Sequence, residues 1–228
     1  MLRAIIFDFD GVLVDSEPLI YEITRQMAAK EGWTLSRDEY FRDYLALDDR
    51  GIAEHLYRSH GVQLDAARRD ELVDWKFHAY AAAIRDGLPA MPGAVEFVNA
   101  VAKHYPLAIA SGSLRSEVEH LLSTIGLRER FALLVTAEDT DRGKPDPEIY
   151  IKAVAGLNGF PMFKESPLLA SHCLAIEDAP GGLRAAQAAG MKCLALAHSR
   201  SASELAHADF LVREFAEIKL DEIRQAFD

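Results

Sequence analysis

The chain has 228 residues, 50% of them hydrophobic and 27% charged, and its 36 acidic residues outnumber the 25 Lys and Arg to give a formal net charge of -11. This composition suits one sizeable folded core, or a core with a smaller second domain, and excludes a disordered scaffold. The acidic balance disfavours binding to nucleic acid, and no apolar run is long enough to span a membrane. We expect a cytoplasmic monomer that has neither kind of partner.

Short apolar runs recur along the chain, and each is followed by a turn or by a helix-like pattern. Because the runs are continuously apolar rather than alternating, they suit strands buried on both faces of a parallel sheet. They lie at 4–8, 107–110, 133–136, 174–176, 193–197 and, more weakly, 210–212. Helical patterns follow at 93–103, 116–126, 147–155 and 180–189. This alternation predicts a doubly wound, Rossmann-like α/β core.

The stretch between the first two strands breaks the alternation, because it contains no convincing strand. Its segments 17–32, 36–45, 48–61 and 65–87 each have the pattern of an amphipathic helix. Ser16 is expected to cap the first helix, and the Gly- and Pro-rich GLPAMPG segment is expected to lead back to the core. We therefore predict a core domain of residues 1–15 and 88–228, with an inserted helical cap domain of residues 16–87.

Polar side chains gather where the predicted strands end, which is where open α/β sheets bind ligands. Taken singly, each is ordinary: an Asp-x-Asp pair often caps a turn, and a loop lysine is usually solvated. Taken together, carboxylates, a hydroxyl and a lysine should converge on one edge of the sheet. The residues concerned are Asp8, Asp10, Ser111, Gly112, Lys144, Glu177 and Asp178.

These groups suit the chemistry of phosphoryl transfer. Clustered carboxylates favour a hard divalent cation such as Mg2+, which prefers oxygen ligands. Lys144, the Ser111 hydroxyl and the backbone amides at Gly112 would suit a phosphoryl group. Asp8 could then attack phosphorus to form an aspartyl-phosphate. Asp10 could protonate the leaving alcohol and afterwards deprotonate the hydrolytic water.

Four segments of the chain resemble the motifs of a known family. The segments DFDGVLVDSE, SGS, GKPDPEIY and IEDAPGGLRAAQAAGM begin at residues 8, 111, 143 and 176. They resemble the four ordered motifs of the haloacid dehalogenase superfamily, in the helical-cap branch that includes β-phosphoglucomutase and phosphoglycolate phosphatase. The resemblance implies that Asp8 is the nucleophile, Asp10 the acid/base, and Ser111 and Lys144 the phosphate contacts. It also implies a Mg2+ site; the ligands would be Asp8, the carbonyl oxygen of Asp10, Asp178 and, as a ligand or a neighbour, Glu177.

The resemblance also narrows the reaction. Dehalogenases and phosphonate-cleaving members of the superfamily lack an acid at the position of Asp10, so its presence favours phosphate-ester chemistry. Related mutases carry a histidine near the cap hinge, where this chain has Ile20 and Tyr21, and a cap lysine that the YLALDDRGIAEHL stretch lacks. We expect a Mg2+-dependent phosphatase for a small phosphorylated metabolite such as a sugar phosphate. The alternatives are a phosphosugar mutase and a phospho-aspartate signalling module, and the inserted cap and Asp10 weigh against the latter.

Two arginines are candidates for substrate specificity. Arg50 lies in the predicted cap, and Arg115 lies just after the second motif. The alternative for Arg50 is an exposed ion pair with Asp48 or Asp49. The alternative for Arg115 is a surface position in the first turn of the next helix.

Overall fold

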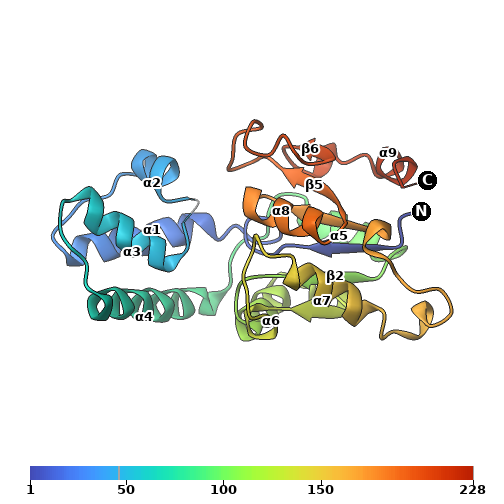
Figure 1. The fold of residues 1–228 in the computed structure, drawn as a ribbon, viewed down its shortest axis with the longest axis horizontal. Coiled ribbons are helices and arrows are strands. Elements are labelled where there is room, and N and C mark those ends of the chain that lie inside the picture. Colours follow the sequence, from blue (N-terminus) through green and yellow to red (C-terminus); the bar gives the residue numbers. More distant parts are fainter. Residues whose placement is uncertain (46, 228) are drawn as a thin grey trace. The chain divides into compact units, whose positions relative to one another are not determined.

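The computed structural model describes residues 1–45 and 47–227; Ala46 of the predicted cap and Asp228 at the end of the predicted core lie outside the described residues. The chain divides into two compact units (Figure 1). One unit consists of Met1–Asp15 with Gly87–Asp228, and the other of Ser16–Asp86. Among the described helices, none combines the length and the apolarity needed to cross a membrane.

The first unit is built on a parallel sheet, in which six strands among the described residues have the order β3-β2-β1-β4-β5-β6. The strands are β1 (Ala4–Phe7), β2 (Leu107–Ala110), β3 (Leu133–Val135), β4 (Cys173–Glu177), β5 (Lys192–Leu196) and β6 (Phe210–Val212). Strands β1, β2 and β4 are buried along their whole length, as continuous apolar runs require. The predicted doubly wound α/β fold is confirmed.

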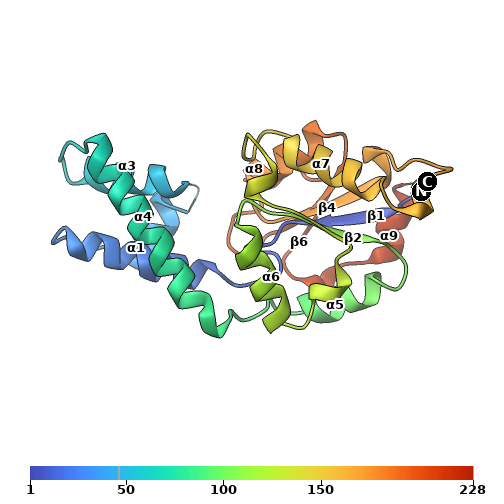
Figure 2. The same ribbon diagram turned by 90° about the horizontal axis from the view of Figure 1, so that it is seen from below.

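Helices cover both faces of this sheet. They are α5 (Ala94–Val101), α6 (Arg115–Thr124), α7 (Glu148–Leu157), α8 (Pro180–Ala188) and α9 (Leu220–Gln225). Helices α7 and α8 lie on one face, and α5 and α6 lie on the other (Figure 2). Alternate side chains of β1 point to opposite faces of the sheet. Ile6 belongs to the core cluster that includes residues of α7 and α8, and the Phe7 ring packs against the rings of Phe97 and Phe131.

Short 3-10 turns occur between the longer elements. They are η1 (Ile84–Asp86), η2 (Arg128–Arg130), η3 (Ala137–Asp139), η4 (Pro161–Phe163), η5 (Ala170–His172) and η6 (Phe215–Glu217). The turn η1 lies within the segment 65–87 that was predicted to be helical. The other turns and the six-residue α9 were not predicted, because a segment shorter than two helical turns carries no usable hydrophobic period.

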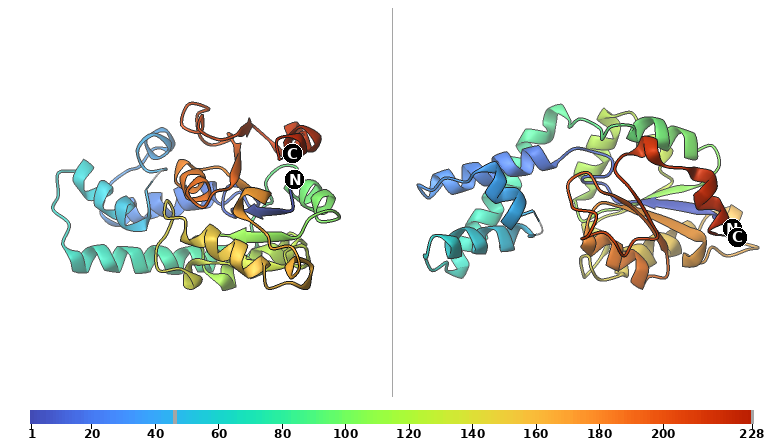
Figure 3. Two further views of the ribbon diagram at one scale, coloured as in Figure 1. Left: turned by 45° about the vertical axis from the view of Figure 1, so that its right-hand side comes forward. Right: turned by 90° about the horizontal axis from the view of Figure 1, so that it is seen from above.

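The second unit is built of helices (Figure 3). Their buried side chains form an apolar core of their own. The helices are α1 (Glu17–Lys30), α2 (Arg37–Asp43), α3 (Asp49–Ser59) and α4 (Ala66–Ala83). The predicted side-chain cap at Ser16 is wrong: Ser16 occupies the N-cap position, but its side chain makes no capping bond. Its ψ of -20° is helical, whereas Ser36, which does cap α2, has the extended ψ of 158° that a capping geometry requires.

Candidate active site

The loop after β1 carries Asp8 and Asp10 and is fixed by its own backbone. The Asp8 amide donates to the Ile176 carbonyl at 2.9 Å, which extends the ladder between β1 and β4 by one residue. The Gly11 amide then donates to the Val14 carbonyl at 2.9 Å and turns the chain back. The apolar residues of the loop have no exposed surface: Phe9, Val12, Leu13 and Val14. The acidic side chains are therefore held by a buried, hydrogen-bonded turn.

Gly11 makes this turn possible for two reasons. Its φ of +73° lies in the left-handed region that other residues avoid. A Cβ atom at this position would also lie 2.3 Å from Oδ2 of Asp178. The missing side chain thus allows the loop after β1 to lie against the acid that follows β4.

Lys144 joins the carboxylates from these two strands. Its Nζ donates to Oδ1 of Asp8 and to Oε1 of Glu177, at 2.7 Å in each case. The side chains of Lys144, Asp8 and Glu177 are only 16%, 12% and 0% exposed, so solvent screens the contacts little. Burial alone would lower the pKa of Lys144, but the two carboxylates outweigh it and hold that pKa above its ordinary value. Lys144 is therefore a permanent cation here.

Glu177 is enclosed by protein. The hydroxyl of Tyr150, which is itself buried in α7, donates to Oε1 of Glu177 at 2.5 Å. The other carboxylate oxygen, Oε2, is buried and has no hydrogen-bond partner among the described residues. Burial raises the pKa of Glu177 to about 7, with a further contribution from the charge of Asp8 and an opposing one from Lys144.

The same edge of the sheet offers a set of metal ligands. Oxygen atoms of Asp8, Glu177 and Asp178 all lie within 4.8 Å of one another. A donor set made only of carboxylate oxygens fits a hard cation such as Mg2+. The orphaned Oε2 of Glu177 adds to the fit, because a buried acceptor without a partner is costly unless a cation or a donor satisfies it.

Asp10 and Ser111 are linked through Ser113. The Ser113 hydroxyl donates to Oδ2 of Asp10 at 2.5 Å, and the Ser113 amide donates to Oγ of Ser111 at 3.0 Å. Ser111 is fully buried at the end of β2, whereas a Cβ atom on Gly112 would meet no atom within 4 Å. The turn after β2 is thus in contact with the acid of the first motif.

Sequence reasoning missed several polar side chains at this edge, namely Ser113, Tyr150, His198 and Ser199. His198 and Ser199 lie just after β5: Nε2 of His198 is 2.5 Å from the Gly11 carbonyl oxygen, and Oγ of Ser199 donates to Asp178 at 3.5 Å. Ligand-binding groups tend to lie just beyond the carboxyl ends of parallel strands. Applying this rule to β5, as well as to the strands before it, would have identified both residues.

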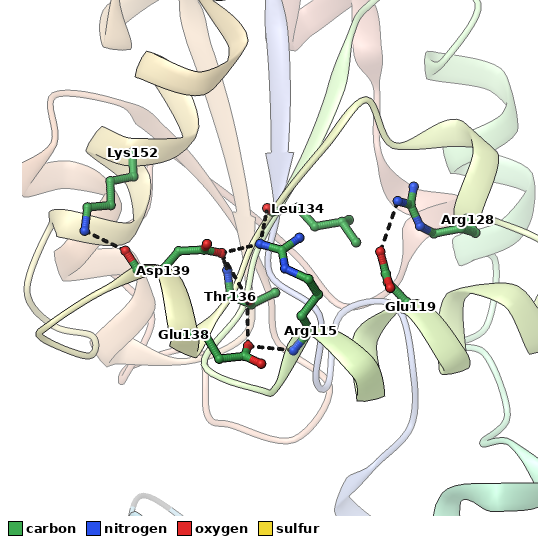
Figure 4. Close-up of polar contacts among 8 residues, drawn as sticks. All are labelled: Arg115, Glu119, Arg128, Leu134, Thr136, Glu138, Asp139 and Lys152. Carbon is green, nitrogen blue, oxygen red and sulfur yellow. Dashed lines mark hydrogen bonds and ion pairs between the residues drawn. The ribbon is translucent and has the colours of Figure 1, made fainter.

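Arg115 contacts the free edge of the core sheet (Figure 4). Its Nη2 donates to Oδ2 of Asp139 at 2.6 Å and to the Leu134 carbonyl in β3 at 3.3 Å. Its backbone amide donates to Glu138 at 2.8 Å. The guanidinium is thus engaged by its own unit, with a side chain that is 40% exposed. Its role in substrate specificity stays a prediction.

Arg50 is an exposed residue of α3, and among the described residues it pairs with neither neighbouring aspartate. Asp48 is the N-cap of the helix and accepts from the Gly51 amide at 2.7 Å. Asp49 forms an ion pair with Lys76 of α4, whose side chain is only 8% exposed. The ion-pair alternative for Arg50 is therefore wrong, and its role in specificity stays a prediction.

A pair of adjacent glycines allows a matched test of the Glu177 site. A Cβ atom on Gly182 would lie 2.0 Å from the Glu177 carboxyl group, whereas one on Gly181 would meet nothing within 4 Å. We expect Gly182→Ala to displace the carboxylate and to lower the free energy of unfolding by about 1–3 kcal/mol. Gly181→Ala, in the same helical turn, should leave it unchanged or raise it by up to about 1 kcal/mol. Urea denaturation measures both, and equal values for the two variants would contradict the packing described here.

Comparison with known proteins places these features in a wider group. A family model described as haloacid dehalogenase-like hydrolase matches residues 2–190. Validoxylamine A 7'-phosphate phosphatase from Streptomyces hygroscopicus subsp. limoneus is 31% identical over 229 residues, which are 96% of this chain and 97% of that protein. The phosphorylated carbohydrates phosphatase of Thermotoga maritima is 29% identical over 198 residues, covering 84% and 83% of the two chains. The crystal structure of β-phosphoglucomutase from Clostridium difficile shares the fold, with a TM-score of 0.80 at 21% identity over 100% of this chain and 97% of that one.

Proposed function

Because the chain belongs to the haloacid dehalogenase-like hydrolase family, we propose that it is a Mg2+-dependent phosphatase that hydrolyses a small phosphorylated metabolite, such as a sugar phosphate, through an aspartyl-phosphate on Asp8. The observation that carries the proposal is the Asp8 carboxylate at the end of β1, held by Lys144 beside two further acids. Relatives that match most of the chain, and are named as phosphatases of phosphorylated compounds, support the choice of substrate class.

The first half of the reaction uses Asp8 as the nucleophile. Lys144 binds Oδ1 of Asp8, and no hydrogen bond within the described residues reaches Oδ2, which is therefore available to attack phosphorus. As the bond from Oδ2 to phosphorus forms, the bond from phosphorus to the ester oxygen breaks. Asp10 gives its proton to that oxygen, so that the product leaves as a neutral alcohol. The Ser113 hydroxyl holds the Asp10 side chain in place.

The second half returns the chain to its starting state. Asp10, now a carboxylate, takes a proton from water as the water oxygen attacks phosphorus. The bond between Asp8 and phosphorus breaks and releases inorganic phosphate. Lys144 stays charged throughout, because its pKa is raised, and it offsets the negative charge on the transferring group.

We propose that Asp8, Asp178 and the Asp10 carbonyl oxygen hold Mg2+, with Glu177 as a further ligand or as the partner that orients Lys144. When bound, the ion supplies positive charge that reduces the repulsion between the Asp8 carboxylate and an anionic substrate. We also propose that the core and the predicted cap have different roles. The helical unit selects the substrate, and Arg50 is its candidate contact for an anionic or hydroxyl group.

The proposal predicts that release of phosphate from an aryl phosphate ester requires Mg2+. EDTA should reduce the rate to background, and added Mg2+ should restore it. Ca2+ is the matched control, because its looser coordination should support little turnover. Equal rates with and without EDTA would exclude the proposed metal dependence. A screen of sugar phosphates with wild-type protein and Arg50→Ala then tests the specificity residue.

A phosphosugar mutase is the nearest alternative, and the residues at the hinge weigh against it. Related mutases carry a histidine near the cap hinge, where this chain has Tyr21, and the Tyr21 ring packs against the Tyr40 ring inside the helical unit. Both reactions share the aspartyl-phosphate, so they are separated by their products. NMR of a hexose phosphate should show free sugar and phosphate accumulating together. Accumulation of an isomeric hexose phosphate that depends on a bisphosphate primer would favour the mutase.

A further inference from the structure

A cavity lined by both charged and apolar side chains lies at the end of the core sheet opposite to Asp8. It has a volume of about 920 Å3, and the segments that line it lead into β1, β2 and β3: residues 1–3, 102–106, and 130 with 132. The cavity therefore lies at the amino ends of these strands, whereas the candidate active site lies at their carboxyl ends. Strands of this length separate the two sites by about 13 Å. The cavity is not an extension of the active site.

The lining of this cavity is cationic. It includes Arg3, Lys103, Arg130 and Arg224, and none of the described residues that line it is acidic. The rest of the chain has the opposite balance, since its formal net charge is -11. A group of cations without acids among them is therefore unexpected from the composition, and it creates a local positive potential in an overall negative field.

Most of these cations have no ion-pair partner among residues 1–45 and 47–227. Elsewhere, guanidinium groups such as those of Arg25 and Arg42 pair with carboxylates. Of the four cations in the cavity, only Arg224 makes an ion pair within the described residues, with Asp221 at 3.0 Å. Lys103 and Arg130 are exposed and make no ion pair in the described part of the chain.

Neutral and aromatic groups hold the other two cations in place. Arg3 donates to the Ser166 carbonyl at 2.8 Å and to the Pro167 carbonyl at 3.1 Å, and it lies over the Phe163 ring at 5.1 Å. Arg224 donates from Nε to the Tyr105 hydroxyl at 2.8 Å. These contacts engage Nη1 and Nη2 of Arg3 and Nε and Nη1 of Arg224, and they fix both guanidinium groups without removing the charge of Arg3. A cation that is already fixed attracts a phosphate group at a low cost in side-chain entropy.

From this arrangement we propose that the cavity binds a small anion carrying two phosphoryl groups. Arg3 and Arg224 form the fixed part of the site, and Lys103 and Arg130 close on the ligand. The volume is within the usual range for small-molecule pockets and exceeds the need of a single phosphate. This site is separate from the proposed catalytic one, so either can be correct without the other.

The test is a titration of the 15N-labelled full chain with inorganic pyrophosphate, in EDTA and at low ionic strength, followed by NMR. We expect the amide signals of Lys103, Tyr105 and Arg130 to shift. In the double variant Lys103→Glu/Arg130→Glu the affinity should fall about tenfold or more, because charge-assisted contacts are lost and repulsive ones take their place. The matched control Arg37→Glu/Arg184→Glu changes the charge equally at exposed positions outside the cavity.

Each outcome decides the matter. Shifts near Lys103 and Arg130 that weaken in the cavity variant but not in the control support the proposal. It is overturned if the shifts are confined to Gly11, Gly112 and Lys144, because pyrophosphate then binds only at the catalytic edge. Equal weakening in both double variants would also overturn it, since the effect would then come from net charge alone. Phosphate release by the cavity variant, measured in parallel, should equal that of the wild type.

Discussion

Replacing Asp8 with asparagine should reduce phosphate release at least about 10^4-fold and leave the fold intact. The amide oxygen of Asn can still accept the hydrogen bond from Lys144, so the ammonium group of Lys144 keeps this partner and the backbone turn should be unchanged. The side chain, however, can no longer attack phosphorus. Steady-state and single-turnover assays with an aryl phosphate measure the loss, and far-UV circular dichroism monitors the fold.

Asp141→Asn is the matched control, because Asp141 is an exposed carboxylate on the loop that carries Lys144. It should retain full activity. Asp8→Ala gives a second variant in which deamidation cannot restore the carboxylate. If Asp8→Ala still turns over within tenfold of wild type, Asp8 is not the nucleophile.

Removal of Lys144 should have the second largest effect, on both stability and activity. Lys144→Met would leave Asp8 and Glu177 without their shared cation in a site that solvent scarcely reaches. Breaking a buried ion pair by removing one partner costs about 3–5 kcal/mol. Loss of a positioned charge that stabilises the transition state should also reduce kcat about 10^2–10^3-fold. Urea denaturation and phosphate release measure the two effects separately.

A second substitution separates these two roles. In Lys144→Met/Glu177→Gln the fully buried carboxylate is gone and only that of Asp8 lacks its cation, so part of the lost stability should return while activity stays low. Lys152→Met is the control, because Lys152 makes a partly exposed ion pair with Glu148 and its loss should cost about 1 kcal/mol or less. Recovery of activity in the double variant would mean that Lys144 only balances the charge of Glu177.

The core fold was predictable because its central strands β1, β2 and β4 are buried on both faces. In continuous apolar runs such as those that form β1 and β2, neither side of the strand faces water. The prediction therefore did not have to decide which alternate side chains point to the core. The convergence of Asp8 and Lys144 followed from the same rule, since ligands bind where parallel strands end.

Other features depend on contacts that no local pattern encodes. The hydrogen bond from Tyr150 to Glu177 requires the particular rotation of α7 against β4, and the sequence around Tyr150 predicts only an apolar helix face. The contact of Arg115 with Asp139 depends on how η3 follows β3. Ser16 failed as a cap because the local backbone is already helical there. Each of these outcomes is decided by tertiary packing rather than by residue type.

Net charge describes the chain as a whole and does not show how charge is distributed over its parts. The acidic composition argued against polyanionic partners and gave no sign of a cationic cavity. Lys103 and Arg130 are distant in sequence, and they come together because each lies just before a strand, at the amino ends of β2 and β3. The same reasoning applies to Lys144, a single cation that makes an acidic site able to accept an anion.

The most direct test of the central claim is to trap the covalent intermediate. The protein is mixed with a 32P-labelled phosphate ester, quenched in acid during turnover, digested, and the labelled peptide is mapped. The label should lie on the peptide that contains Asp8, should be released by hydroxylamine as an acyl phosphate is, and should be absent from Asp8→Asn. Rapid turnover with no label on Asp8, or with the label on another residue, would contradict the proposed mechanism.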